Sequence, residues 1–306
     1  NTGVGYDTLT NNTTGSNNVA VGHSAMLLNT TAANNTAMGY FALEKNQTGE
    51  QNVSIGTESM LANTSASQNT AVGYRALFAN TTGTSNVAIG TGVMDSCTTG
   101  TENTAVGYFA LNSMTTASRG TAMGQLTLQN ATGTGNTAVG WRAGIDVTAG
   151  ANNLLLGHDA GNSGSPSGSI TTGSNNVVLG DNNISNLFCA DTSISASDSR
   201  DKTDVESFNI GLAWIEALRP VTYRWDRRTW YGTREKPFGT PDGSKKRDRL
   251  HIGFLAQEAL EVEKANGYGS SNDDSLVVNL TDDGMSYGMK YERLVPILVN
   301  AIKELS

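Results

Sequence analysis

Disulfide, metal-binding and membrane-spanning patterns are missing from this sequence. Its two cysteines, Cys97 and Cys189, are too few and too far apart for a disulfide framework or a metal site. We therefore expect assembly in a reducing cytosol, with no metal and no cofactor. No segment reaches the ~18 consecutive apolar residues of a membrane span, and no signal peptide opens the chain, so we expect no membrane insertion.

Proline and charge are scarce in one part of the chain only. Residues 1–196 hold 10 of the 28 acidic residues, 4 of the 20 basic residues and one of the five prolines. Residues 197–306 hold the remainder, together with three of the four tryptophans. We predict a polar array rich in Thr, Asn and Gly, followed by an ordinary mixed globular domain. The net charge of −8 argues against general nucleic-acid binding.

A motif of the form Asn-x-Ala-Val-Gly recurs along the first 180 residues. Its closing glycines are 17 residues apart for seven successive intervals, and the next intervals are 16, 17 and 23. Such a short fixed period is typical of a stack in which each repeat forms one coil. Since the chain begins inside a repeat, we expect it to be a piece of a longer protein. The glycines are Gly5, Gly22, Gly39, Gly56, Gly73, Gly90, Gly107, Gly124, Gly140, Gly157 and Gly180.

Two apolar stripes follow the repeat. One, of Val, Ile, Met or Leu, stands three places after the repeat Asn, and the other, of Leu or Met, stands eight places after it. Both lie in short β-prone runs bounded by turn residues. Coils stacked about 4.8 Å apart would make each stripe an apolar ladder and the Asn column a ladder of amide hydrogen bonds. We predict a parallel β-roll or β-helix over 1–180, because Gly and β-branched residues disfavour a helical solenoid.

The array is predicted to be homotrimeric. One coil of 17 residues carries little aliphatic surface, so several chains are expected to pack around a shared axis, and three is the usual number. His23 and His158 follow the repeat glycine where other coils have Tyr, Thr or Trp, and we interpret them as surface variants of that position. We expect residues 161–172 to form an inserted loop, and residues 181–196 to comprise the end of the last coil and the linker to the second domain.

The closest copy of the motif with Ile is residues 86–90, which read Asn-Val-Ala-Ile-Gly. Over residues 1–180 the array resembles the head repeats of trimeric adhesins, whose Asn-x-Ala-Ile-Gly units build a left-handed parallel β-roll. The resemblance implies a trimeric fold and says little about function.

A second motif stands at the junction of the two parts. Ser197, Asp198, Arg200 and Lys202 form the pattern Ser-Asp-x-Arg-x-Lys, and further blocks follow in order at 251–258, 291–296 and 301–305. The segment 197–306 therefore resembles the C-terminal intramolecular chaperone auto-processing domain of phage tail spikes and tail fibres. Endosialidase tail spikes and L-shaped tail fibres carry this domain, and myelin regulatory factors contain a relative.

The resemblance implies that this domain cuts its own chain. The family cleaves the bond before the serine, so the scissile bond would join Ala196 and Ser197, with Ser197 as nucleophile and Lys202 as general base. A protonated lysine cannot act as a base, so Lys202 must be desolvated or lie near other cations such as Arg200. A spacing of five puts Ser197 and Lys202 on different faces of a regular helix, so the segment must bend or the pair must form only in the packed trimer. Alternatively, both residues merely cap and decorate the first helix.

Asp198, Arg200, His251, Gln257 and Glu258 are further candidates for this site. The last three could orient the catalytic pair or the carbonyl. Equally, His251 could be an ordinary strand residue, with Gln257 and Glu258 in the polar first turn of a helix. The basic run at 245–249 lies among Gly, Pro and Asp, which favours a solvated hairpin tip or an arm that grips the acidic array.

The second part is predicted to be an α+β domain with a C-terminal helix. We expect helices over 208–218 and 256–264, and strands over 221–225, 250–255 and 276–280. On the last helix Leu294, Leu298, Ala301 and Leu305 are spaced by four, three and four residues. This seam suits a short trimeric bundle, although a core helix of one subunit would show the same pattern.

Nearly identical coils create a folding hazard, because a slip by one whole repeat keeps almost every ladder contact. We therefore predict a trimeric phage tail-fibre segment for host attachment, located in the virion and assembled in the host cytoplasm. Its domain 197–306 would trimerise first, set the register of the array and then remove itself. A host glycan or protein is a possible receptor. The alternatives are the head of a bacterial surface adhesin and the stalk of a glycan depolymerase tail spike.

Overall fold

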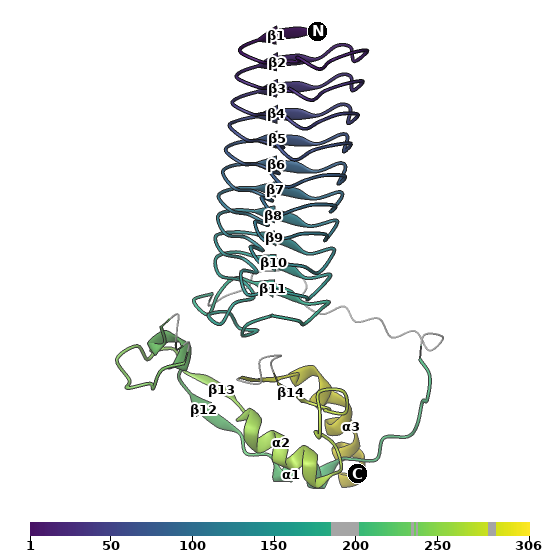
Figure 1. The fold of residues 1–306 in the computed structure, drawn as a ribbon. Helices are drawn as coiled ribbons and strands as arrows, with labels where there is room; N and C mark the ends of the chain where they lie inside the picture. The colour runs from purple at the N-terminus through teal and green to yellow at the C-terminus, as the bar shows by residue number, and fades with distance from the viewer. Residues whose placement is uncertain (185–201, 234–235, 237, 281–285) are drawn as a thin grey trace. The chain divides into compact units, whose positions relative to one another are not determined.

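The chain folds into two compact units, Asn1–Asn183 and Ile184–Ser306. A computed structural model describes residues 1–184, 202–233, 236, 238–280 and 286–306 (Figure 1). The first unit consists of stacked coils, and the second combines short strands with three α-helices among its described residues.

The first unit is a parallel β-solenoid, which confirms the predicted fold class. Eleven strands of three residues each form one sheet in chain order, and each strand pairs with the next in parallel (Figure 1). Over the first eight strands the paired residues are 17 positions apart, for example Thr70 with Val87. The strands are β1 (Thr2–Val4), β2 (Val19–Val21), β3 (Thr36–Met38), β4 (Val53–Ile55), β5 (Thr70–Val72), β6 (Val87–Ile89), β7 (Thr104–Val106), β8 (Thr121–Met123), β9 (Thr137–Val139), β10 (Leu154–Leu156) and β11 (Val177–Leu179).

The two apolar stripes lie on opposite sides of the coil wall. The Leu/Met stripe, including Met60, Leu77 and Met94, is fully buried and fills the interior together with the middle residue of most strands. The Val/Ile stripe is the third residue of each strand, and it points outward because side chains alternate along a strand. Most of its members are exposed, among them Met38 and Ile89. Only one of the two predicted ladders therefore forms the core of this chain.

Residues of the buried stripe occupy a left-handed backbone conformation. Leu77 has a φ of 54° and Met94 a φ of 49°, a region that costs non-glycine residues about 1–2 kcal/mol. Gly144 and Gly161 continue the same position with φ of 67° and 77°. A Cβ atom on Gly144 would lie 2.7 Å from the side chain of Leu128 in the preceding coil, so glycine fits where neighbouring leucines already fill the space.

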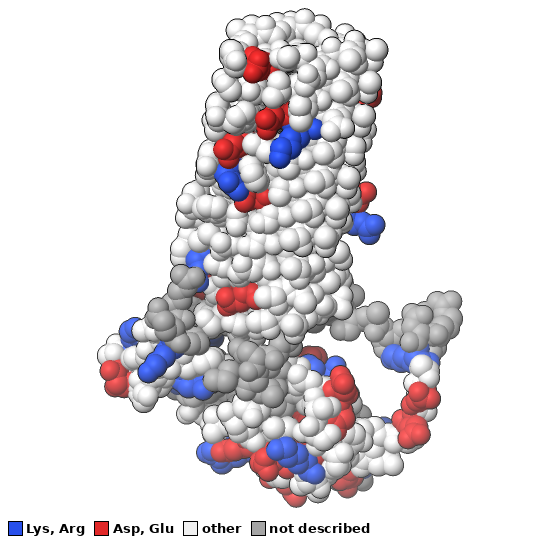
Figure 2. Space-filling view, viewed as in Figure 1, with Lys and Arg blue, Asp and Glu red and all other residues white. Residues whose placement is uncertain are grey.

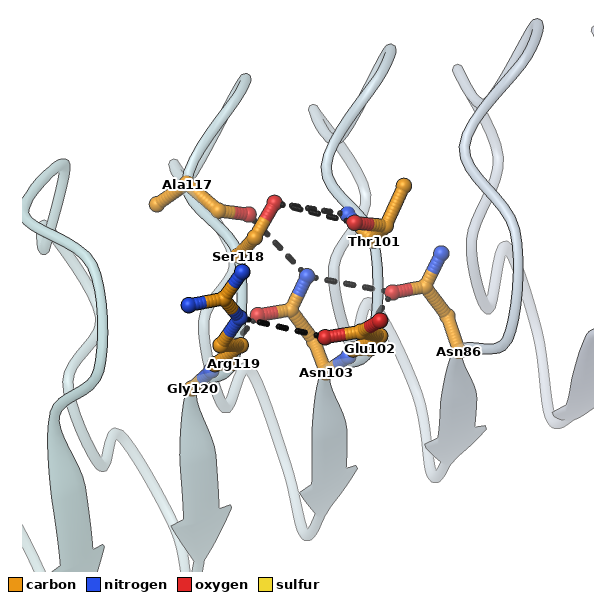
Figure 3. Close-up of polar contacts among 8 residues, drawn as sticks. All are labelled: Asn86, Thr101, Glu102, Asn103, Ala117, Ser118, Arg119 and Gly120. Atoms are coloured by element: carbon orange, nitrogen blue, oxygen red, sulfur yellow. Dashed lines mark hydrogen bonds and ion pairs between the residues drawn. The ribbon is translucent and has the colours of Figure 1, made fainter.

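The repeat asparagines form a buried hydrogen-bond ladder, as predicted (Figure 3). In one rung, both the backbone N–H and the side-chain Nδ2 of Asn103 donate to Oδ1 of Asn86 over 3.0 Å. Asn103 Nδ2 also donates to the Ala117 carbonyl, and Asn103 Oδ1 accepts from the Gly120 N–H. Because Gly120 has no side-chain amide, the side-chain ladder is interrupted there and resumes at Asn136. Each side-chain amide thus forms hydrogen bonds with both the preceding and the following coil, and these bonds hold the coils together.

Glycine at the repeat position is required by the backbone of the next coil along the chain. Gly73 has a φ of 134°, and a Cβ atom there would lie 2.5 Å from the Gly90 carbonyl oxygen. Gly135 also has a positive φ, 70°, but its Cβ would meet nothing closer than 4.0 Å, and other coils have Asn, Gln, Ser, Glu or Arg at that position. Only the first of these glycines is therefore imposed by contact between coils.

Replacing Gly73 with Ala should destabilise the solenoid by about 3 kcal/mol or more, since both the φ and the contact with the Gly90 carbonyl are incompatible with a Cβ atom. The measurement is the loss of β-sheet circular dichroism on heating the full chain. Gly135→Asn is the matched control and should leave the transition unchanged or raise it slightly. Equal transitions for both variants would contradict this account.

Cys97 stands inside the solenoid, in a buried column that is Asn in earlier coils and apolar in later ones. Burial raises the pKa of its thiol to about 11. Cys97 is free, whereas Cys189 lies outside the described residues. The thiol of Cys97 therefore acts as a small apolar side chain.

The second unit is α+β, as predicted, with a C-terminal helix. Two antiparallel pairs form, β12 with β13 and β14 with β15. The predicted helix at 208–218 is shorter in the structure, the predicted strands are trimmed to three residues, and β15 was not predicted. The elements are α1 (Leu212–Ala217), β12 (Val221–Tyr223), η2 (Arg228–Tyr231), β13 (His251–Gly253), α2 (Ala256–Ala265), β14 (Val278–Leu280), β15 (Tyr287–Met289), η3 (Tyr291–Arg293) and α3 (Leu294–Leu305).

The core of the second unit is built by helices α1 and α3. Trp214 of α1 is buried against Leu294 and Ile297 of α3. A hydrogen bond joins the same two helices, since the Leu212 N–H donates to Glu304 Oε2 over 3.0 Å. Asn300 Nδ2 of α3 also donates to the carbonyl of Phe208, which precedes α1, over 2.6 Å. Among the helices of the described part of the chain, none has the length and apolar character needed to cross a membrane.

Candidate functional site

Most of the predicted cleavage motif falls outside the described residues. Ala196, Ser197, Asp198 and Arg200 belong to the segment 185–201, for which the structure gives no placement. Lys202 is described, and it is exposed in a stretch without regular secondary structure. The pairing of Ser197 with Lys202 therefore stays a prediction.

His251 lies on β13, opposite Tyr223 of the antiparallel partner strand β12. Its ring stacks on Tyr223 with the ring centroids 5.5 Å apart, and Trp225 meets it edge-on at 6.3 Å. In this unit the imidazole thus belongs to an aromatic cluster on the β12–β13 ribbon.

Gln257 and Glu258 lie in the first turn of α2. Glu258 forms a two-pronged ion pair with Arg219, with Nε to Oε2 at 3.1 Å and Nη2 to Oε1 at 2.5 Å. The guanidinium lowers the pKa of the Glu258 carboxyl. Since Arg219 follows α1, this pair links α2 to the chain that leaves α1. It holds Glu258 as a structural carboxylate in the single subunit.

The blocks at 251–258 and 291–296 come together in space. The Phe254 N–H donates to the Tyr291 hydroxyl oxygen over 3.2 Å, and the two rings stack with centroids 6.2 Å apart. A Cβ atom on Gly253 would lie 2.5 Å from that hydroxyl, so the glycine makes room for the tyrosine. The second and third sequence blocks are therefore in direct contact.

The basic run 245–249 belongs to an exposed loop that packs on its own aromatic residues. The guanidinium of Arg247 lies 5.0 Å from the ring centroid of Trp230, and Lys245 Nζ lies 5.1 Å from that of Tyr231. Tyr231 in turn donates to Asp226 over 2.6 Å. These contacts give the loop a defined shape. A contact between this loop and the solenoid stays a prediction.

Helix α3 separates its apolar residues onto two faces, and this corrects the predicted seam. Leu294 and Ala301 are buried within the subunit, with Ile297 between them. Leu298 and Leu305 belong to a different, exposed face. The predicted seam thus mixed the two faces, because spacings of three and four residues do not by themselves distinguish them. The outward stripe consists of Val295, Leu298, Ile302 and Leu305, spaced by three, four and three residues.

A buried carboxylate that was not predicted from the sequence organises the segment that leads into β14. Glu263 of α2 is fully buried, and its Oε1 accepts from the N–H groups of Val277 (2.6 Å) and Val278 (2.8 Å). Its Oε2 accepts from Ser275 Oγ at 2.8 Å and from the Leu276 N–H at 3.2 Å. The signal in the sequence is an acidic residue four places after Ala259, on the same helix face.

Replacing Glu263 with Gln should loosen this segment, because an amide offers one acceptor oxygen and turns an N–H donor toward other donors. We expect a loss of roughly 2–3 kcal/mol of local stability. Hydrogen exchange of the amides at 276–278, measured in the intact chain, should become more than tenfold faster. The control is Glu261→Gln, an exposed carboxylate paired with Lys264, which should change nothing. Unchanged exchange in Glu263→Gln would contradict the anchoring role.

The comparison with known families adds a finding about the same part of the chain. Residues 197–268 match the family model described as chaperone of endosialidase. The match begins at Ser197, the first residue of the junction motif, and it includes β12, β13 and α2. No curated protein and no solved structure matches the chain.

Residues 197–268 therefore match the endosialidase-chaperone family and follow the parallel β-solenoid along the chain, which confirms the resemblance predicted for this segment. This combination suggests a tail-spike-like or tail-fibre-like protein. The matched family implies self-cleaving chaperone activity in general, and the match covers residues 197–268 of this chain.

Proposed function

We propose that this protein is a trimeric tail-fibre segment for attachment of a phage to its host. Its C-terminal unit acts as an intramolecular chaperone and then removes itself by cutting between Ala196 and Ser197. The observation that carries the proposal is the family match beginning at Ser197, behind a solenoid whose coils are nearly interchangeable.

The outward stripe of the solenoid supports assembly from several chains. Its residues recur on every strand and leave a continuous apolar face on the outside of the coil wall. Soluble proteins rarely expose apolar patches of that extent. Three chains packed around a common axis would bury this face. The exposed residues of the stripe are Val4, Met38, Ile55, Ile89, Met123, Val139, Leu156 and Leu179.

The outward stripe of α3 supports a three-helix contact in the chaperone unit. Leu298 and Ile302 are 42% and 65% exposed within one subunit, although α3 already buries its other face on α1. The alternation of three- and four-residue spacings along the stripe is the a/d pattern of a coiled-coil seam. Assembly would therefore begin at the C-terminal end of the chain.

A chaperone unit is needed to set the register in which the three solenoid chains align. Every paired strand residue in β2 through β8 would find an almost identical partner one coil away, so a slipped trimer would lie close in energy to the native one. A unit that trimerises first aligns the three chains at one end, and coils can then stack from there. Removing the unit afterwards leaves a fibre without an easy route to unfold, which is kinetic stability.

The proposed cleavage uses only groups of the chain and one water. Ser197 Oγ attacks the Ala196 carbonyl carbon, and Lys202 Nζ accepts the hydroxyl proton. The Ala196–Ser197 C–N bond breaks as the Ser197 nitrogen takes up a proton, leaving an ester between Ala196 and Ser197 Oγ. Water then hydrolyses the ester and regenerates the hydroxyl. Because Lys202 is exposed in the single subunit, we propose that trimer packing supplies the dry environment that its role as base requires.

Mass spectrometry and light scattering of the expressed full chain test the proposal together. The expected result is two fragments, 1–196 and 197–306, from particles that contain three chains. An uncut chain of 32.1 kDa would exclude the self-cleavage, and a monomeric particle would exclude the chaperone role.

A further inference from the structure

The position directly after each repeat glycine alternates between two kinds of side chain. An aromatic ring occupies every second coil, at Tyr6, Tyr40, Tyr74, Tyr108 and Trp141. The coils between them carry side chains with hydrogen-bonding groups at the same position, His23, Thr57, Thr91, Gln125 and His158. We call the aromatic set the ring column. Its period is two coils, which nothing in the packing of the solenoid core requires, since the core repeats every coil.

The ring column is exposed along the solenoid. Tyr40, Tyr74 and Tyr108 are 47%, 51% and 49% exposed, so the same environment recurs every second coil. Since neighbouring coils are separated by the strand spacing of about 4.8 Å, successive rings of the column lie roughly 10 Å apart. Two sugar rings of an extended polysaccharide span a comparable length.

One coil shows how a flat group fits between two rings of the column. The imidazole of His23 lies between Tyr6 and Tyr40, with ring centroids 5.3 Å and 5.2 Å away. Trp141 is likewise stacked on His158 at 4.8 Å. Threonine stands at the equivalent positions 57 and 91, and its side chain has no ring to cover the neighbouring tyrosines. Tyr40 and Tyr108 each pack against the phenylalanine that follows them, Phe41 and Phe109, with ring centroids 4.1 Å and 4.3 Å apart. The aromatic surface that stays exposed on the column therefore lies beside a threonine hydroxyl group in these two coils.

The charges next to the ring column favour a neutral ligand. Arg75 is held by Asp95 through two hydrogen bonds of 2.8 Å and 3.1 Å, and Arg142 lies 3.5 Å from Asp159. Carboxylates outnumber these arginines around the column, since Glu58 also approaches Arg75. On the face of the stack drawn in Figure 2, acidic and basic side chains stand in several places among mostly uncharged residues. A sulfated or otherwise anionic chain would thus meet carboxylates and arginines that are already paired.

From this arrangement we infer that the ring column binds a neutral, extended glycan. Sugar rings stack their C–H faces on the tyrosines, while Thr57 and Thr91 offer hydrogen bonds to hydroxyl groups between them. The inference deepens the proposed function, because it assigns the receptor class of a host-attachment fibre. Tyr74 and Tyr108, with Thr91 between them, form the central unit of the site.

The test replaces Tyr74 and Tyr108 together with Thr in the full chain. Threonine occupies the same position in two other coils, so the substituted coils keep a native side chain for that site. The probes are cellohexaose, xylohexaose and chitohexaose as neutral extended glycans, maltohexaose as a curved one, and a heparin hexasaccharide as a polyanion. Binding is measured by calorimetry.

We expect at least one neutral extended hexasaccharide to bind more tightly than maltohexaose and the heparin fragment. The double Thr variant should weaken that binding at least tenfold. Tyr74→Phe with Tyr108→Phe keeps the rings and should retain affinity within about threefold. Gln68→Ala, on a different column of the solenoid, should bind as the parent does.

Four results would overturn the inference. They are binding of none of the neutral extended probes, equal or stronger binding of maltohexaose or heparin, unchanged affinity in the double Thr variant, and loss of the trimer in that variant. The last result would mean that the rings face a neighbouring subunit. Cleavage and particle mass are scored separately on the parent chain, so a failure of self-cleavage or trimerisation is distinguishable from a failure of glycan binding.

Discussion

Replacing Ser197 with Ala should leave an intact chain of 32.1 kDa in a trimer of normal shape. Alanine removes the only proposed nucleophile, so we expect cleavage to slow by about a thousandfold or more. The uncut trimer should lose its resistance to heat and detergent at milder conditions than the cut one, because the attached C-terminal units offer a place for unfolding to begin. Denaturing gels with and without heating measure both effects.

Two further variants make this result specific. Lys202→Arg keeps the positive charge but cannot act as a base, so it should also stay uncut. Ser199→Ala lies two residues from the nucleophile and should be cut as the parent is. Normal cleavage of Ser197→Ala would falsify the mechanism. If that variant were monomeric, an attached C-terminal unit would not be sufficient to assemble the trimer, and this would contradict the proposed chaperone role.

Placing glutamates at Leu298 and Ile302 should abolish the trimer. Both side chains are exposed in the single subunit, so the α1–α3 core with Trp214 stays intact. In a three-helix contact each substitution would bury an unpaired charge, which costs several kcal/mol and weakens association by about a thousandfold or more. Light scattering should then report the mass of one chain. Cleavage should also be lost, because Ser197 and Lys202 are proposed to pair only in the packed trimer.

The control for this experiment lies on the same helix. Lys303→Gln changes an exposed charged residue beside the outward stripe and should leave both mass and cleavage unchanged. Circular dichroism of the double Glu variant should retain its helical signal, which shows that the subunit still folds. A trimer that survives both glutamates would place the subunit contact elsewhere.

The repeat made the solenoid predictable. Gly73, Gly90 and their equivalents recur at a fixed interval, and any chain that stacks must bring residues one period apart into register. The Asn ladder followed from the same argument, because like residues meet across neighbouring coils. The order of elements in the second unit was also predictable in outline, while β15 and the short α1 were not, since three to six residues carry too weak a local signal.

The candidate site was predictable in part. The junction motif gave the start of the chaperone segment at Ser197, which the family match shares. Glu263 was missed because its role depends on backbone N–H groups at 276–278, which come from a distant part of the sequence. The contacts of Glu258 with Arg219, 39 residues away, were equally invisible to local patterns.

The sequence by itself determined the period of the coil, its parallel stacking and the place where the array gives way to another kind of domain. These features depend on spacing along the chain, which is readable without a fold. Tertiary structure alone decided which apolar stripe faces inward, because that depends on left-handed corners at residues such as Leu77 and on the alternation within each strand. It likewise divided the apolar residues of α3 into a buried and an outward face, since only packing against Trp214 distinguishes two stripes of the same spacing.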